Sequence, residues 1–167
     1  MKTTKDIEAL IPNLQSKDGM QRERARKKLV KIGRPAVPFL IELLSDRKQH
    51  LRWEGCKALG EIMDPAAAPA LVDALSDESV EVRWLAAEGL LALEKKALVP
   101  LLKILETEFE SPFVREGAHH ILHALERQHL LSKDSKVVLD ALRYLEPKIS
   151  VAMAASKALQ SNLKSSR

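Results

Sequence analysis

Residues 83–93 read RWLAAEGLLAL, and three other segments of the chain align with them without a gap. These segments are RERARKKLVKI at 22–32, RWEGCKALGEI at 52–62 and REGAHHILHAL at 115–125. Each begins with an arginine, has a leucine seven residues later, and follows the previous one after 30, 31 or 32 residues. Within 83–93 the apolar residues lie three and four positions apart, which is the spacing of one face of an α-helix. The chain therefore repeats a helix.

A second apolar helix follows three of these segments. Its copies begin at a proline and read PFLIELLSD at 38–46, PALVDALSD at 69–77 and PLLKILETE at 100–108, and a weaker copy, VLDAL, stands at 138–142. Gly33 and Pro35 lie between the two helices of the first unit, where glycine ends helices and proline favours the first turn of the next. A pair of helices this short cannot bury its apolar face alone, so neighbouring pairs must stack into an array.

The repeated segments predict a single all-α domain over residues 1–167, with about nine or ten helices. Four full repeats would span 18–45, 46–76, 77–106 and 107–146. The segment 4–17 has the apolar spacing of the second helix type and would form a half repeat before them. The segment 147–163 is a copy of the first type without its arginine and would form a terminal half repeat.

The pattern resembles the HEAT-repeat family, and most closely its short-repeat branch, named after phycobilisome lyases. The residues that carry the resemblance are Val82-Arg-x-x-Ala-x-x-x-Leu90 and Asp64-Pro65 with Pro69-Ala-Leu71. The resemblance implies a right-handed α–α superhelix (a HEAT-like solenoid) with the first helix of each pair on the convex side and the second on the concave side. It also implies a ladder of aspartate–arginine contacts between repeats. Its members here would be Asp46, Arg52, Asp77 and Arg83, whereas Arg115 has no acidic residue six positions before it.

The net charge of +4 hides a strong division along the chain. Residues 1–53 hold 13 basic and 6 acidic residues, residues 54–111 hold 5 and 12, and residues 112–167 hold 9 and 5. Because sequence order is spatial order in a solenoid, these segments form a basic band, an acidic band and a second basic band. Such a pattern favours a partner of matching pattern, or another copy of the chain, over nonspecific binding of polyanions.

The first basic band is concentrated in a cluster of seven residues: Arg22, Arg24, Arg26, Lys27, Lys28, Lys31 and Arg34. Clustered cations of this kind bind phosphates. The cluster lacks interleaved aromatic residues that would stack on bases, and the acidic band beside it would repel a long duplex. A solvated charged face is the simpler interpretation, and nucleic-acid binding, as in HEAT-like DNA-binding proteins, is the alternative.

The second helices carry an acidic residue on the side away from the core. Glu42, Asp73 and Asp140 occupy this position in three repeats, and Ile104 occupies it in the remaining one. If the second helices line the concave side, these residues form an acidic concave ridge. The alternative is that they are the ordinary polar face of an exposed helix.

Trp53 and Trp84 occupy the same repeat position, directly after the arginine. On a helical wheel this position points away from the apolar stripe, and Leu91 shares that outward face. The two indoles should lie on neighbouring helices about 10 Å apart. Two interpretations are open: the strip is a contact surface for a partner or another copy, or the indoles pack between repeats.

The sequence contains few candidates for catalytic or metal-binding residues. His119 and His123 are four positions apart on one helix beside His120, which is the spacing of zinc-binding pairs, but further ligands and enclosure are lacking, so we interpret them as a polar face. Cys56 has no histidine within one helical turn and is interpreted as a small core residue. A glycine-rich phosphate loop, a GxSxG motif and paired cysteines are all missing. We expect no enzymatic activity, no metal and no cofactor; the alternative is a metal-dependent enzyme that uses the His119, His120 and His123 cluster.

The sequence thus predicts a non-enzymatic scaffold for protein–protein interaction, with an assembly or chaperone-like role and a partner whose identity stays open. The resemblance adds the alternative of a subunit of a phycobilin-lyase-like enzyme. No apolar stretch approaches the roughly 20 residues of a membrane span, and residues 1–10 have no secretory signal, so we expect no membrane partner. The single cysteine fits a reducing compartment, which predicts a cytoplasmic location.

Overall fold

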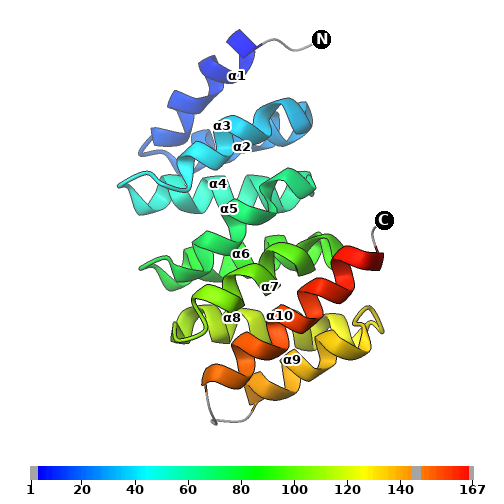
Figure 1. Ribbon diagram of the computed structural model, residues 1–167. Coiled ribbons are helices and arrows are strands. Elements are labelled where there is room, and N and C mark those ends of the chain that lie inside the picture. Colours follow the sequence, from blue (N-terminus) through cyan, green and yellow to red (C-terminus); the bar gives the residue numbers. More distant parts are fainter. Residues whose placement is uncertain (1–3, 144–147, 166–167) are drawn as a thin grey trace.

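The computed structural model describes residues 4–143 and 148–165. These residues form ten α-helices joined by short turns and 3-10 helices, without a strand among them (Figure 1). The helices are α1 (Thr4–Leu10), α2 (Gly19–Ile32), α3 (Val37–Leu43), α4 (Gln49–Ile62), α5 (Ala68–Asp73), α6 (Val80–Ala92), α7 (Leu98–Thr107), α8 (Pro112–Arg127), α9 (Lys133–Arg143) and α10 (Lys148–Ser165). The prediction of an all-α solenoid is confirmed.

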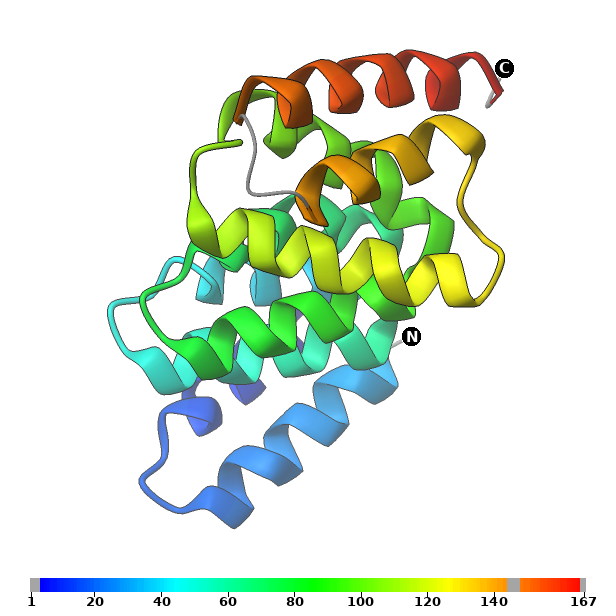
Figure 2. The same ribbon diagram turned by 90° about the horizontal axis from the view of Figure 1, so that it is seen from below.

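The helices that begin near the repeated arginine stack side by side in chain order. We call α2, α4, α6 and α8 the first layer, and α3, α5 and α7 the second layer (Figures 1 and 2). Side chains cap the starts of three first-layer helices, because Asp18, Ser79 and Ser111 each accept a hydrogen bond from a main-chain amide of the first turn. Such caps satisfy amides that have no partner within the helix.

The core lies between the layers and repeats with the sequence. The leucine seven residues after each arginine, at positions 29, 59, 90 and 122, is at most 1% exposed in every repeat. Each repeat therefore adds one leucine to a continuous column of buried side chains. A single pair of helices would expose this apolar column on both sides, so contacts between neighbouring repeats stabilise the array.

The first layer is closest packed between α4 and α6. A Cβ atom on Gly60 would lie 3.2 Å from the Cα atom of Gly89, so the two backbones touch at this point. Neither glycine needs a positive φ, and what the position requires is the absence of a side chain. The glycines thus set the distance between the second and third repeats.

The C-terminal end departs from the expected pattern. As a terminal half repeat of the first type, α10 would stack on α8, but it packs instead against α7 and α9 (Figure 2). Its buried residues are Val151, Ala155, Ala158 and Leu159. Residues 144–147, where the fourth repeat was expected to end, lie outside the described residues.

The position of α10 accounts for one irregularity of the sequence. Ile104 on α7 is only 8% exposed, whereas Glu42 and Asp73, at the equivalent position on α3 and α5, are exposed. Because α10 packs on α7, the side of α7 that would face solvent in a regular array is covered, and an isoleucine there is buried. The isoleucine is therefore part of the α7–α10 contact.

We predict that Ile104→Asp lowers the free energy of unfolding by about 3 kcal/mol, because the carboxylate would be buried without a partner. The matched control is Asp73→Asn at the same repeat position, which should change it by less than about 0.5 kcal/mol. Urea denaturation followed by circular dichroism measures both. Equal stability of the two variants would mean that α10 does not cover this face of α7 in solution.

Candidate functional site

The repeated arginines share one contact. Each donates from Nη1 to the main-chain carbonyl of the residue six positions earlier, in the turn that precedes its helix. The pairs are Arg22 with Ser16 at 2.8 Å, Arg52 with Asp46 at 2.9 Å, Arg83 with Asp77 at 2.8 Å and Arg115 with Phe109 at 3.4 Å. Because the acceptor is a main-chain atom, an acidic side chain is not needed there, which explains why Arg115 keeps the contact beside Phe109.

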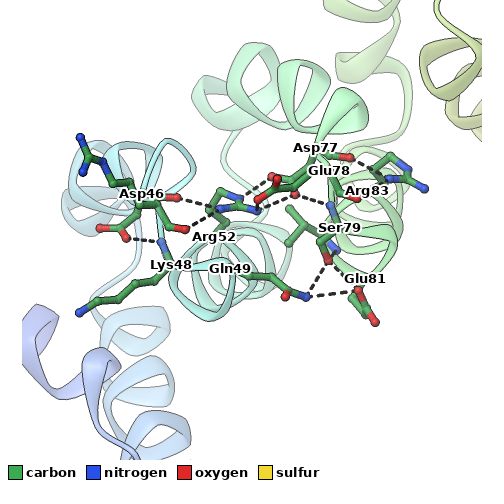
Figure 3. Close-up of polar contacts among 11 residues, drawn as sticks. Asp46, Lys48, Gln49, Arg52, Asp77, Glu78, Ser79, Glu81 and Arg83 are labelled. Carbon is green, nitrogen blue, oxygen red and sulfur yellow. Dashed lines mark hydrogen bonds and ion pairs between the residues drawn. The ribbon is translucent and has the colours of Figure 1, made fainter.

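Among the four expected members of the ladder, one aspartate–arginine contact joins two repeats, between Arg52 and Asp77 (Figure 3). The Nε and Nη2 atoms of Arg52 lie 2.6 and 3.0 Å from the carboxylate oxygens of Asp77, and Nη2 also lies 2.8 Å from Glu78. The hydrogen bond with Asp77 holds the pKa of Arg52 above its usual value. This buried, bidentate ion pair joins α4 to the turn before α6.

The other expected members of the ladder have different partners. The Asp46 carboxylate accepts a hydrogen bond from the Lys48 amide at 2.8 Å. The guanidinium of Arg83 lies over the ring of Phe113, 4.1 Å from its centroid. The predicted ladder therefore reduces to one rung, with main-chain and aromatic contacts elsewhere.

The basic cluster is divided between contacts inside the molecule and the surface, because two members pair with a buried carboxylate and two others are in exposed ion pairs. Arg26 is buried and lies 2.6 Å from the Glu54 carboxylate, which also contacts Arg22 at 3.3 Å. Lys27 pairs with Glu23 at 2.6 Å, and Arg34 pairs with Asp64 at 3.4 Å. The three remaining members make no ion pair with any residue that the structure describes, and they are Arg24, Lys28 and Lys31. Arg22 and Arg26 are therefore occupied within the molecule, whereas the other five cations remain exposed.

Glu54, the buried carboxylate between Arg22 and Arg26, was not predicted from the sequence. The equivalent positions hold Arg24, Leu85 and Gly117, so the repeat pattern carries no sign of a buried carboxylate. Its role depends on Arg26, which reaches it from the neighbouring helix.

The two tryptophans have different surroundings despite their equivalent positions. Trp53 is half-buried, and the Arg26 guanidinium lies over its ring, 5.4 Å from the centroid. Trp84 is 57% exposed, and its ring centroid lies 5.2 Å from that of His120 on α8. Leu91 is half-buried and packs against the core. Of the three predicted contact residues, Trp84 alone is strongly exposed.

Trp84 forms one wall of a pocket of about 150 Å³ between α6 and α8. We call this site the Trp84 pocket, and its lining residues are Leu75, Val80, Arg83, Trp84, Ala87, Phe113, Glu116, Gly117 and His120. Val80 is 60% exposed and Phe113 is 42% exposed, so three large apolar side chains stand together at the surface. Such a cluster is typical of a contact surface.

Gly117 opens the pocket. A Cβ atom on Gly117 would lie 2.9 Å from the Leu75 Cδ2 atom, so a larger residue would clash with the leucine that forms part of the lining. Val80, Phe113 and Gly117 were not among the predicted contact residues, because the other repeats hold unrelated residues at these positions. The available signal was that Phe113 is an aromatic residue two positions before an arginine of the repeat.

The rim of the Trp84 pocket is acidic. Glu116 lines the pocket, the carboxylate of Glu88 lies 3.3 Å from the lining residue His120, and Glu81 follows the lining residue Val80 on α6. All three carboxylates are exposed, and we call these three residues the acidic rim. A hydrogen bond from Ser79 lowers the pKa of Glu81, which keeps that carboxylate ionised. The Arg83 cation nearby already contacts two main-chain carbonyls and the Phe113 ring. The pocket therefore combines an apolar floor with negative charge at its edge.

The histidines and the cysteine contribute no recognised reactive group. The rings of His119 and His123 stack with centroids 6.0 Å apart, and burial together with neighbouring positive charges lowers the pKa of His119. No group of three metal-binding side chains occurs among residues 4–143 and 148–165. Cys56 is buried, and burial raises its pKa to about 12, so the thiol stays protonated near neutral pH.

The three acidic residues of the predicted concave ridge do not lie on one continuous surface. Glu42, Asp73 and Asp140 are all exposed. However, α10 packs against both α7 and α9, and Asp140, on α9, lies 3.4 Å from Arg143 on its own helix. Asp140 is thus separated from the other two residues by α10.

The sequence matches the family model of HEAT repeats over residues 7–91, about half of its length. The chain therefore belongs to the HEAT-repeat family. A comparison with curated proteins gives no match. None of the described helices is long and apolar enough to cross a membrane.

Among solved structures, the chain is similar to one in the complex of CpcE and CpcF of phycocyanin lyase from Nostoc sp. PCC7120. The two are 26% identical, the match covers 93% of this chain and 99% of that chain, and the TM-score is 0.61. An engineered protein is 20% identical over 95% of this chain and 79% of its own, with a TM-score of 0.47. A designed armadillo repeat protein is 17% identical over 93% of this chain and 99% of its own, with a TM-score of 0.39.

We predict that Arg52→Ala lowers the free energy of unfolding by about 3 kcal/mol, because it leaves the Asp77 carboxylate without its main partner in a largely buried position. Arg115→Ala removes only one long hydrogen bond to a carbonyl and should cost about 1 kcal/mol. Chemical denaturation of both variants beside the unchanged chain measures the difference. If the two substitutions cost the same, the contact between repeats adds nothing beyond the shared carbonyl contact.

Proposed function

We propose that the chain is a non-enzymatic scaffold that binds a protein partner at the Trp84 pocket and serves in the assembly or stabilisation of that partner. The observation that carries the proposal is the exposed group of Val80, Trp84 and Phe113 around a pocket on the first layer. A cytoplasmic location fits the single cysteine, which is free and buried.

The chemistry of the pocket supports a protein ligand. Its volume suits one aliphatic side chain of the size of leucine or methionine. Exposed tryptophan is among the residues that contribute most to binding energy when a partner covers it, because a large apolar area leaves water at a small entropic cost. The acidic rim adds a polar border, which is the usual arrangement around the apolar centre of an interface.

The architecture supports a scaffold role. The column of buried leucines and the Gly60–Gly89 contact fix the first-layer helices relative to one another. A partner therefore meets a preformed surface and loses little free energy in ordering it. Proteins of the HEAT-repeat family present their helical layers in this way.

We predict that Trp84→Ala weakens partner binding by about thirtyfold or more, the effect of removing a central contact residue. The tagged chain, immobilised and exposed to an extract of its source cells, would be compared with the variant by quantitative mass spectrometry. Proteins that depend on Trp84 would then be purified and titrated by calorimetry.

The matched control is Val137→Ala, which removes an exposed apolar side chain on α9, away from the pocket. Both variants should unfold at nearly the same urea concentration as the unchanged chain, because neither side chain is in the core. Retention of the same proteins by both variants would contradict the assignment of the Trp84 pocket as the binding site.

The similarity to a structure from the phycocyanin lyase complex favours a second candidate function, that of a subunit of a phycobilin-lyase-like enzyme. This function predicts that the purified chain, alone or with a second subunit, changes the visible absorption and circular dichroism of a free bilin. Bovine serum albumin at the same concentration serves as the comparison. A bilin spectrum that does not change on addition of the chain and candidate second subunits would contradict this candidate.

A further inference from the structure

We propose that the partner at the Trp84 pocket is a second copy of this chain, which binds there through the exposed basic face of its α2. The inference rests on the proposed function, because it names the occupant of the same site. It is carried by the match between two surfaces of the first layer that lie at opposite ends of the array.

The surface on α2 is a stripe of exposed residues spaced by four, three and four positions. We call it the basic stripe, and its members are Met20, Arg24, Lys27 and Lys31. This spacing places all four on one face of the helix. The opposite face of α2 holds Ala25 and Leu29, which are buried in the core. The stripe therefore points away from the molecule.

Charges in the basic stripe are largely available. Lys27 pairs with Glu23 on its own helix, whereas Arg24 and Lys31 contact no carboxylate among the residues that the structure describes. Met20 is 58% exposed at the start of the helix. An exposed apolar residue beside two available cations is the chemical complement of an apolar pocket with a carboxylate rim.

The basic stripe and the acidic rim match in the spacing of their charges as well as in the sign. Arg24 and Lys31 are seven residues apart on α2, and Glu81 and Glu88 are seven residues apart on α6. Seven residues of α-helix rise about 10.5 Å, so two helices laid together can bring both pairs into contact at once. Trp84 lies between the two glutamates and Lys27 lies between the two cations, which allows a cation–π contact at the centre.

Methionine suits the pocket itself. Its unbranched side chain has three rotatable bonds and a polarisable sulfur that packs well against aromatic rings. Trp84 and Phe113 provide such rings on either side of the opening. Met20 of one copy can therefore fill the space that stands open in the other.

The arrangement is self-complementary. The helix α2 and the α6–α8 site belong to the same layer (Figure 1). A twofold axis between two copies would therefore repeat the contact, with the α2 of each chain on the pocket of the other. Four helices of about 20 Å in length, spaced by about 10 Å, offer a face on the order of 800 Å². That is the area per partner of a standard specific interface.

The test is sedimentation equilibrium of the full chain from about 1 to 200 μM. We expect a monomer–dimer equilibrium whose dissociation constant rises at least about tenfold between 50 and 500 mM salt, because exposed ion pairs are screened. Trp84→Ala should shift the equilibrium to the monomer. The reversal of two exposed cations on α9, Lys133→Glu with Lys136→Glu, is the matched control and should leave it unchanged.

A charge exchange gives the decisive comparison. One variant carries Arg24→Glu with Lys31→Glu, and the other carries Glu81→Lys with Glu88→Lys. Each alone should be monomeric over the whole range, whereas an equimolar mixture should form a 1:1 complex. If a charge-reversed variant does not fold, judged by circular dichroism, neutral Gln replacements at the same positions take its place and must weaken the dimer.

A chain that stays monomeric at 200 μM, a dimer that the stripe variants do not weaken, or a mixture that fails to associate would each overturn the inference. These results leave the proposed function intact if Trp84→Ala still abolishes capture of another protein. If Trp84→Ala changes neither dimerisation nor capture, the inference and the proposed function both fail.

Discussion

The hydrogen bond from the repeated arginine to the main-chain carbonyl six residues earlier is the constraint on which the rest of the structure depends. It ties the start of each first-layer helix to the turn that leads into it, four times along the chain. Fixing that turn sets the direction in which the next helix leaves, so successive pairs stack in register and the leucines at 29, 59, 90 and 122 meet in one core. Because the acceptor is backbone, the contact tolerates any residue at its other end, and repeats of different sequence keep the same geometry.

Periodicity made the array predictable, since the arginine, the leucine and the proline-led second helix each recur at nearly constant intervals. It did not make the end of the array predictable. The segment that forms α10 has the apolar spacing of a first-layer helix, yet it packs on α7 and α9. The relevant signal was Ile104, an apolar residue at a position that is acidic in three other copies. This isoleucine indicates a buried position, but the pattern within one repeat does not show which distant helix covers it.

Trp53 and Trp84 show the same limit for the site. Their positions in the repeat are equivalent, so helical geometry alone assigns both to the outward face. The surroundings differ because the neighbouring helices differ: Arg26 covers one indole, whereas Gly117 and Phe113 leave a pocket beside the other. The exposed tryptophan of the pocket could therefore be predicted from the repeat. The rest of the pocket could not, because Phe113 and Gly117 come from a neighbouring repeat and have no equivalents in the other repeats.

The distribution of charge follows from how many ion pairs the array makes internally. Arg22, Arg26 and Arg52 lie near carboxylates that come from the next repeat, and these pairs join repeats to one another. Such cations stabilise the fold and are lost to any ligand, so the net +7 of the first 53 residues overstates what a partner meets. What stays at the surface is ordered by helix: cations on α2, carboxylates on α6 and α8. Because the helices of a solenoid stack at constant spacing, these charged groups are held at fixed distances from one another. A second surface with the opposite charges at the same distances can therefore bind to them.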